Sequence, residues 1–538
     1  MRQLRSSVWL VLVGFTAVSA GAESKPNFSG IWKLLNGEHP QVIIIDQHET
    51  ELRVFQFIED RPSMVRGLID GQPHSQIVDG APCDFLARWE GNSLFFETKR
   101  HIHDSIGPAA YVRHLMRLAA NGKTMSLERA NVSPQPGTFH EKWERQDPLP
   151  REDILTPFDG RLKLDDAGAG LSGVEGNRLR GWMAYAFNDV PQAERELRAI
   201  IGQEPPSKFR DEARERLAEI YLRNGMVRKA LPYCKFVERA FFYGKLAKFP
   251  EMSVTHRGYA RVQAARDPEG RTMLPVSAAG KEARYLADTG ANMSLLRMSE
   301  AGRLGLKRER WPRMLIMNGI VKFWARLTIV PVLTVGATRL ENVPFWVVPD
   351  ARLDGAGVIG IDLLLKLETL RWNAGGDVEI GFPAQEKNIR DANLCFWDHD
   401  LLTDVPSNGH DNMVFFLDTG RDAMELYPRF AAGNLDLASA NGKQSVSGWY
   451  GLGGHRELME LTLPEITLSI GGAQTTKRPA GILLERPPLH SKIHGVIGMD
   501  VLNSAPRVTL DLHAMRLTIE AADAGLSAPE AARDILRH

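Results

Sequence analysis

The sequence predicts a multidomain, mainly β chain: an N-terminal β-barrel or meander, a short α-helical segment and a C-terminal β fold with two lobes. Three observations support this prediction. Short alternating runs of apolar and polar residues recur between residues 24 and 150, as expected for half-buried strands. Between residues 174 and 245 the apolar spacing changes to three and four, as on one face of a helix. Residues 255–522 return to β texture and contain an internal repeat.

Composition excludes several classes of protein. The chain has 538 residues, of which 43% are hydrophobic and 25% charged, enough to form several globular cores. Its 66 Lys and Arg residues balance 66 Asp and Glu residues, so charge does not favour nucleic acid as a partner. The three cysteines, Cys83, Cys234 and Cys395, lack the paired spacing of a zinc site. We therefore expect no nucleic acid, no metal ion and no cofactor.

Residues 1–22 have the features of an export signal. Arg2 and Arg5 precede an apolar run over residues 8–18, and Ala20-Gly21-Ala22 matches a signal-peptidase site. The run is shorter than the ~20 residues that a transmembrane helix needs. An uncleaved anchor is the alternative. We expect an exported protein, either periplasmic or secreted.

Residues 24–150 are predicted to form a β domain. Runs at residues 42–45, 51–57, 93–98 and 124–128 alternate in polarity and are separated by Asn, Gly and Asp. This spacing favours an up-and-down meander that closes into a small barrel. Gly30-Ile31-Trp32 resembles the Gly-x-Trp opening of lipocalin-like domains. Trp32 is then a plug at the barrel base or, alternatively, marks a domain with a ligand in the barrel mouth.

Three histidines in this region raise the question of a metal. His101 and His103 would share one face of a strand, and His114 follows nearby. A solvated strand face is the preferred explanation, because no third ligand is identifiable.

A linker over residues 151–173 leads into a helical segment over residues 174–245. The linker contains Pro157 and a run of small residues at 165–170. In the helical segment the order Leu217-Ala218, Tyr221, Gly225, Ala230-Leu231 resembles one tetratricopeptide unit. Two helix pairs are too few to be stable alone, so we expect the segment to pack on a neighbour. It is either a spacer or a platform for a peptide or protein partner.

The internal repeat contains the residues suited to catalysis. Tyr285-Leu286-Ala287 leads into Asp288-Thr289-Gly290, and Phe415-Phe416-Leu417 leads into Asp418-Thr419-Gly420. Each copy is followed by an apolar-apolar-Gly element and a Leu-containing helix start: Gly357-Val358-Ile359-Gly360 and Gly495-Val496-Ile497-Gly498. Asp-Thr-Gly alone is a weak signal. Its recurrence in the same context, 130 residues later, is a strong one.

This combination resembles the pepsin and retropepsin superfamily of aspartic peptidases, in particular bacterial retropepsin-like proteins with two lobes in one chain. The resemblance implies lobes at residues 255–385 and 386–522, followed by a tail at 523–538. It also implies that each lobe contributes one catalytic aspartate to a shared cleft. The catalytic and supporting residues implied are Asp288 and Asp418 with Thr289, Gly290, Ser294, Thr419, Gly420, Ile359, Gly360, Ile497 and Gly498.

The chemistry of peptide hydrolysis explains these residue types. Two carboxylates a few ångströms apart do not both ionise easily, so they share a proton. The ionised group can take a proton from water while the protonated group polarises the peptide carbonyl. The Thr289 and Thr419 hydroxyls can bond across the lobes, and Gly290 and Gly420 allow a tight approach of the backbone.

The second copy departs from the pattern. Arg421 stands where a small residue is expected, and no hydroxyl occurs at the position equivalent to Ser294. A cation beside Asp418 would favour its ionised form and disturb the sharing of the proton. Alternatively, Arg421 points outward and pairs with an acid.

A flap over the cleft is expected from residues 314–323, which read as a hairpin with Asn318-Gly319 at its tip. A plain surface hairpin is the alternative.

The sequence thus supports two functions: an exported aspartic endopeptidase acting on a peptide or protein substrate, or a catalytically inactive two-lobed module that binds peptides. The separation of the Asp288 and Asp418 side chains discriminates between them. A ligand-binding role centred on the barrel is a third possibility.

Overall fold

The computed structural model describes residues 25–36, 42–48, 50–58, 61–78, 81–101, 110–146, 156–158, 160–161, 172–203, 208–234, 243–306, 313–318, 321–353, 355–397, 399–407, 410–427, 429–430, 443–451, 454–483 and 493–521. The predicted export signal and the predicted tail lie outside the described residues. Within these ranges, no helix is long and apolar enough to cross a membrane.

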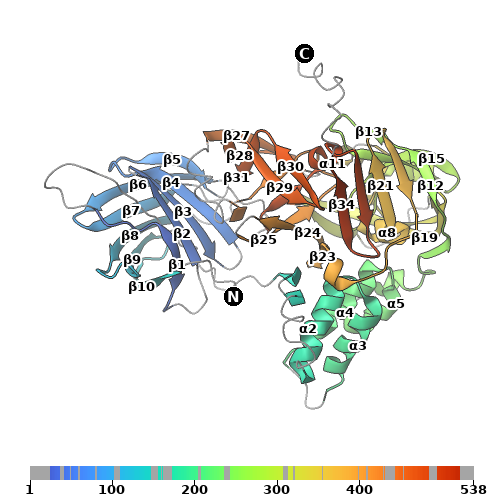
Figure 1. Ribbon diagram of the computed structural model, residues 1–538, viewed down its shortest axis with the longest axis horizontal. Coiled ribbons are helices and arrows are strands. Elements are labelled where there is room, and N and C mark those ends of the chain that lie inside the picture. The colour runs from blue at the N-terminus through green and yellow to red at the C-terminus, as the bar shows by residue number, and fades with distance from the viewer. Residues whose placement is uncertain are drawn as a thin grey trace.

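The N-terminal part forms an antiparallel sheet, shown in blue in Figure 1. Its strands are β1 (Gly30–Leu34), β2 (Val42–His48), β3 (Glu51–Ile58), β4 (Arg61–Leu68), β5 (His74–Val78), β6 (Ala81–Glu90), β7 (Ser93–Arg100), β8 (Ala110–Leu118), β9 (Thr124–Ser133) and β10 (Gly137–Gln146). The order is β4-β3-β2-β1-β10-β9-β8-β7-β6-β5. Strands that are consecutive in the chain are neighbours in the sheet, except that β4 and β5 stand at its two ends, and β1 pairs with β10. This up-and-down order is that of a meander, and its closure into a small barrel stays a prediction.

The two end strands of this sheet, β4 and β5, are consecutive in the chain and touch. The Arg66 backbone N–H donates to the side-chain oxygen of Gln76, 3.1 Å away. Trp32 is fully buried, and its Nε1–H donates to the carbonyl of Phe28. The likeness to a lipocalin barrel, with Trp32 as its plug, stays a prediction.

The histidines do not form a metal site among the described residues. His114 is buried and stacks on Phe96 with ring centroids 4.1 Å apart. Burial holds the pKa of His114 well below its usual range, so the ring is neutral. His101 pairs with Asp84, and His103 lies outside the described residues. In the described part of the chain, no group of three His, Cys, Asp or Glu residues is arranged to hold a metal ion.

Helices follow where the helical period predicted them. They are α2 (Gly173–Ala186), α3 (Val190–Ile201), α4 (Arg210–Arg223), α5 (Val227–Ala230) and the short 3₁₀ helix η3 (Leu231–Tyr233). Asp189 begins α3, because its carboxylate accepts from the Gln192 backbone N–H. Gly225, with φ +70°, ends α4. The likeness to a tetratricopeptide unit stays a prediction.

The helices pack on the C-terminal half. The Arg223 guanidinium lies 3.9 Å from the centroid of the Phe396 ring. Lys366 and Lys387 donate to the carbonyls of Asn224 and Asn188, at 2.8 and 2.9 Å. The buried apolar residues of the helices belong to the same core cluster as those of the C-terminal sheets.

The first lobe is a sheet with the order β11-β19-β16-β20-β15-β14-β18-β17, and β13 pairs with β14. Its strands are β11 (Ser253–His256), β13 (Ala265–Arg266), β14 (Thr272–Ala278), β15 (Lys281–Ala287), β16 (Leu295–Arg297), β17 (Arg313–Asn318), β18 (Val321–Val335), β19 (Thr338–Val348) and β20 (Gly357–Ile359). The helices α7 (Met298–Arg303), η4 (Asp350–Arg352) and α8 (Ile361–Leu367) accompany it.

The second lobe is a sheet with the order β23-β24-β25-β32-β26-β31-β28-β27. Its strands are β23 (Leu394–Trp397), β24 (Asp400–Ser407), β25 (His410–Leu417), β26 (Glu425–Leu426), β27 (Lys443–Gly451), β28 (Gly454–Leu463), β31 (Ala480–Leu483) and β32 (Gly495–Ile497). The hairpin β29 (Ile466–Ile470) and β30 (Ala473–Lys477) and the helices η5 (Ile389–Asp391) and α11 (Met499–Asn503) complete it.

A further sheet joins the two halves of the repeat. Its order is β12-β22-β21-β33-β34, with β12 (Ala260–Gln263), β21 (Thr369–Asn373), β22 (Asp377–Ile380), β33 (Arg507–Asp511) and β34 (Arg516–Glu520). Strand β33, near the end of the second lobe, thus pairs with β21, near the end of the first.

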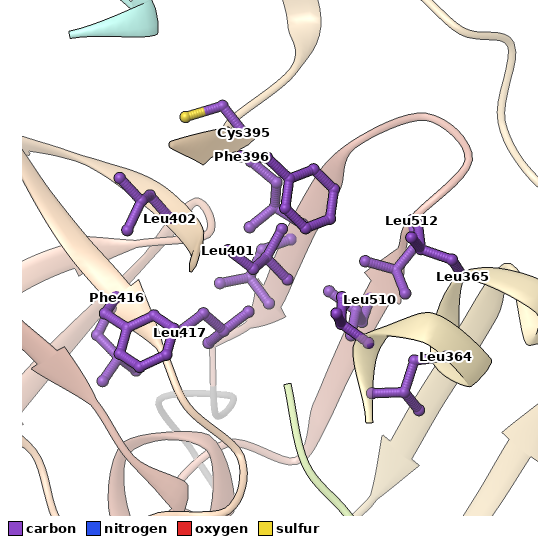
Figure 2. Packing of buried hydrophobic residues seen from close by; sticks show 14 of the residues in the cluster. Leu364, Leu365, Cys395, Phe396, Leu401, Leu402, Phe416, Leu417, Leu510 and Leu512 are labelled. Atoms are coloured by element: carbon purple, nitrogen blue, oxygen red, sulfur yellow. The ribbon is translucent and has the colours of Figure 1, made fainter. Parts of the chain in front are cut away.

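One apolar core cluster extends beneath these sheets, and a smaller one lies within the first lobe. Figure 2 shows Leu364 of α8 and Leu510 of β33 in the same cluster as Leu401 of β24 and Leu417 of β25. The two lobes are therefore held against each other by shared apolar packing. Among the described residues, the N-terminal part has a separate apolar cluster, which lies between residues 28 and 143.

Candidate active site

Asp288 stands at the end of a buried strand. β15 pairs with β20 in parallel, with Leu286 opposite Val358 and Ala287 opposite Ile359. The Asp288 N–H continues this ladder by donating to the Ile359 carbonyl, 3.0 Å away. The apolar strand and the apolar-apolar-Gly element thus fix the backbone that carries the carboxylate.

The second copy repeats this arrangement. β25 pairs with β32 in parallel, with Phe416 opposite Val496 and Leu417 opposite Ile497. The Asp418 N–H donates to the Ile497 carbonyl, 3.1 Å away. The two Asp-Thr-Gly loops therefore have the same support at equivalent positions.

The loops bind each other through their threonines, both of which are buried. The Thr289 N–H donates to Thr419 Oγ1 and the Thr419 N–H donates to Thr289 Oγ1, each at 3.0 Å. The hydroxyls then donate across the lobes, from Thr289 to the Leu417 carbonyl at 2.5 Å and from Thr419 to the Ala287 carbonyl at 2.8 Å. This reciprocal network fixes one loop against the other.

The glycines allow the two carboxylates to meet. A Cβ on Gly290 would lie 2.4 Å from Asp418 Oδ1, and one on Gly420 would lie 2.3 Å from Asp288 Cγ. Within each loop the glycine N–H donates to its own aspartate Oδ1, at 2.8 Å for Gly290 and 2.9 Å for Gly420. Each carboxylate therefore occupies the space that the missing side chain of the opposite loop leaves.

The two aspartates interact directly. A side-chain hydrogen bond joins Asp288 to Asp418, and burial, followed by the charge of Asp418, raises the pKa of Asp288 well above its usual range. Such a bond needs one proton on the pair. Both residues are only half-buried. The arrangement is chemically able to activate a water molecule and polarise a carbonyl.

Gly360 and Gly498, which follow Ile359 and Ile497, allow close packing of backbone on backbone. A Cβ on Gly360 would lie 2.7 Å from the Ala291 carbonyl oxygen, and one on Gly498 would lie 2.7 Å from the Ala423 carbonyl. The backbone after each aspartate loop thus packs directly on the start of α8 or α11.

In the first lobe a serine and a carboxylate hold the loop. Ser294 donates from its hydroxyl to Asp362 Oδ1 at 2.7 Å, and from its N–H to Asp362 Oδ2 at 3.2 Å. The same hydroxyl accepts from the Gly360 N–H at 3.0 Å. Burial raises the pKa of Asp362 to about 6.

In the second lobe a lysine replaces the absent hydroxyl. Met424 is the equivalent of Ser294, and its N–H donates to Asp500 Oδ1 at 2.8 Å. Lys477, at the end of β30, donates to Asp500 Oδ2. Sequence reasoning gave no role to Asp362, Asp500 or Lys477. The recurrence of Asp two residues after the glycine was a signal for the first two, whereas Lys477 has no counterpart in the repeat.

Arg421 pairs with an acid of its own lobe. Its guanidinium donates to Glu425, four residues along the chain, and the side chains of the pair are 15% and 18% exposed. The predicted pairing with an acid is therefore present, but the Arg421 side chain is largely buried and does not point outward. The backbone of Arg421 follows the first lobe, because its carbonyl accepts from the Met499 N–H as that of Ala291 accepts from Ile361, both at 2.8 Å.

The predicted hairpin is present as β17 and β18, with Asn318 opposite Val321. Gly319 lies outside the described residues. Trp324 of β18 is 56% exposed, so this hairpin offers an aromatic ring to solvent. Its role as a flap stays a prediction.

Comparisons with known proteins place one family in this region. Residues 274–363, which include Asp288 and Gly360, match the family model of aspartyl proteases. A solved structure of a retropepsin-like aspartic protease from Rickettsia conorii matches with 17% identity, 24% of this chain and 96% of that chain covered, and a TM-score of 0.20. No curated protein matches.

Proposed function

We propose that this protein is an exported aspartic-type endopeptidase that hydrolyses peptide bonds with water activated by Asp288 and Asp418. The observation that carries the proposal is the meeting of two carboxyl groups from equivalent loops of two lobes, each in the space left by the glycine of the opposite loop. The threonine network that holds these loops supports it. The match of residues 274–363 to the aspartyl protease family supports it independently.

The chemistry needs one proton on the pair. The ionised carboxylate takes a proton from water, and the resulting hydroxide oxygen bonds to the carbon of the scissile carbonyl. The protonated carboxyl gives its proton to the carbonyl oxygen. As the tetrahedral intermediate collapses, one of its hydroxyls gives a proton back to the ionised carboxylate, the C–N bond breaks, and the leaving nitrogen takes a proton from the other carboxyl, which restores the singly protonated dyad. The raised pKa of Asp288 keeps this singly protonated state populated at a higher pH than an ordinary carboxyl would.

Charge around the site is compatible with proton sharing. Arg421 is the feature that favours an inactive, peptide-binding module, because a cation beside Asp418 would favour its ionised form. Its guanidinium is engaged by Glu425, so the positive charge beside Asp418 is balanced within its own lobe. We therefore favour the endopeptidase over the inactive peptide-binding module as the function of this protein.

The proposals of export and of a protein partner rest on features of the amino-acid sequence. Arg2, Arg5 and the apolar run at residues 8–18 support passage across a membrane to the periplasm or the exterior. The substrate is a peptide or a protein, and the helical segment is a candidate platform for a protein partner.

Cleavage of a defined peptide library, read by mass spectrometry between pH 3 and 7, tests the proposal. We expect cleavage by the purified protein, its suppression by a pepstatin-type inhibitor and its loss in Asp288→Asn. Peptides that are bound but never cut would establish the binding module instead. Cleavage that persists in Asp288→Asn would contradict the assigned mechanism.

A further inference from the structure

Among the differences between the two lobes, one concerns a pair of positions that are in contact in the second lobe, Arg421 and Glu425. Glu425 pairs with Val496 in the second lobe as Leu295 pairs with Val358 in the first. Arg421 and Ala291 occupy equivalent positions, as their matching backbone bonds to α11 and α8 show. The second lobe thus carries an arginine and a glutamate where the first carries an alanine and a leucine.

These positions lie on the carboxylate side of each sheet. Leu286 and Asp288 are two residues apart at the end of β15, so their side chains leave the same face. Leu286 packs with Leu295 and Val358 in an apolar cluster that also contacts Ala291. The same register in the second lobe places Glu425 and Val496 on the face of Asp418.

Stability does not explain the charged pair. Arg421 and Glu425 are 15% and 18% exposed, and removing two charges this far from water costs about as much as their attraction returns. The first lobe builds the same loop with apolar residues. Glu425 Oε2 is, moreover, buried and has no hydrogen-bond partner among the described residues. A buried acceptor of this kind is costly unless something binds it.

We propose that Arg421 and Glu425 are specificity-determining residues that select a substrate side chain with an N–H donor on the second-lobe side of the cleft. Arg421 holds Glu425 Oε1, which leaves Oε2 to accept from a lysine, arginine, glutamine or asparagine side chain of the substrate. This inference rests on the proposed peptidase function and adds a substrate class to it.

Conversion of the pair to the residues of the first lobe is the direct test. The variant Arg421→Ala/Glu425→Leu replaces a buried ion pair by apolar residues, which is often tolerated. We compare cleavage-site profiles of the wild type and this variant on the same peptide library. The wild type is expected to favour N–H donor side chains at one position flanking the scissile bond. The variant is expected to lose that preference by about tenfold or more and to favour apolar side chains there.

Two further variants sharpen the comparison. Glu425→Gln keeps the shape of the side chain and removes its charge, and it is expected to weaken the preference for lysine and arginine more than for glutamine. Arg478→Ala/Glu465→Leu removes an ion pair whose side chains are 69% and 53% exposed in the same lobe. This control is expected to cleave with the wild-type profile.

The outcomes separate this inference from the proposed function. An unchanged profile in the Arg421→Ala/Glu425→Leu variant, or a wild-type preference for acidic side chains at that position, would overturn it while leaving the peptidase intact. Absence of cleavage by the wild type would count against the peptidase. In that case an array of the same peptides, probed with Asp288→Asn protein and with the same protein carrying Arg421→Ala/Glu425→Leu, shows whether binding follows the donor.

Discussion

Gly420 has no space for a side chain, because its missing Cβ would lie 2.4 Å from both carboxylate oxygens of Asp288. We predict that Gly420→Ala displaces the dyad and lowers turnover by roughly a hundredfold, since a shift of about 1 Å has that effect on reacting groups. Gly302 of α7 is a matched control in the first lobe, because a Cβ added there would meet nothing within 4 Å among the described residues. Gly302→Ala should keep full activity in the same peptide-cleavage assay. Equal activity of the two variants would show that the loops have room to adjust.

Asp362 provides a test by pH. Burial raises its pKa from 3.8 to about 6, so the folded protein binds its proton more tightly than the unfolded chain does. Its contribution to stability is therefore largest below about pH 4 and falls as the pH rises to about 6. The difference is on the order of 1–2 kcal/mol, because the side chain keeps some exposure.

We predict that Asp362→Asn weakens the decline of stability between pH 4 and 6. Urea unfolding of the wild type and of the variant at a series of pH values measures this difference. The other titrating groups are common to both proteins and cancel in the comparison. Parallel curves for the two proteins would mean that Asp362 titrates in the ordinary range.

The predictability of individual residues depended on the repeat. Asp288 and Asp418 stood out because the same strand, tripeptide and apolar-apolar-Gly element occur twice. The orientation of Arg421 could not be derived, since its acid partner, Glu425, was only one of several nearby acids. Lys477 was missed for another reason, because it reaches Asp500 from a hairpin that lies outside the repeated motifs.

At the scale of elements, each aspartate loop is tied to the helix that follows the apolar-apolar-Gly strand. Asp362 of α8 and Asp500 of α11 do this in the two lobes, with Ser294 and Lys477 as the side chains that satisfy them. The second lobe therefore retains the helix aspartate that binds the loop, but its side-chain partner is Lys477 where the first lobe has Ser294. The strands beneath were predictable from their apolar runs, whereas a tie between distant side chains depends on packing that no local pattern encodes.

This exchange predicts a rescue. Lys477→Met leaves Asp500 without its cation and should lower kcat by roughly tenfold, as expected for a charge-assisted hydrogen bond. Adding Met424→Ser places a hydroxyl at the position of Ser294 and should restore much of the loss without changing KM. Arg478→Met, one residue further, removes an exposed charge and should have no effect. Failure of Met424→Ser to restore kcat would mean that Lys477 acts elsewhere.

For the whole molecule, the boundaries of the apolar cores decide which parts are independent. The N-terminal sheet has its own cluster, which includes Phe28, Trp32 and Trp143. The helices share a cluster with both lobes. The mainly β, multidomain organisation followed from alternating runs, but the sheet that joins β21 to β33 was not predictable, since it pairs segments more than a hundred residues apart.

We predict that residues 24–150 expressed alone unfold in one cooperative transition. Residues 172–234 expressed alone should show little helix, because the apolar surface that they bury lies on the lobes. Circular dichroism of the two fragments during heating measures both. A stable, cooperative helical fragment would contradict the shared core, and an unstructured N-terminal fragment would show that its sheet depends on its neighbours.

The central claim is that Asp288 and Asp418 act as one catalytic unit assembled from two lobes, and the kinetics of their asparagine variants test it most directly. Both substitutions keep the size of the side chain and remove one carboxylate. The account predicts that Asp288→Asn, Asp418→Asn and the double variant all lose at least about a thousandfold in kcat/KM, with the double variant little worse than either single one. Wild-type cleavage by Asp418→Asn, or losses that multiply in the double variant, would contradict it.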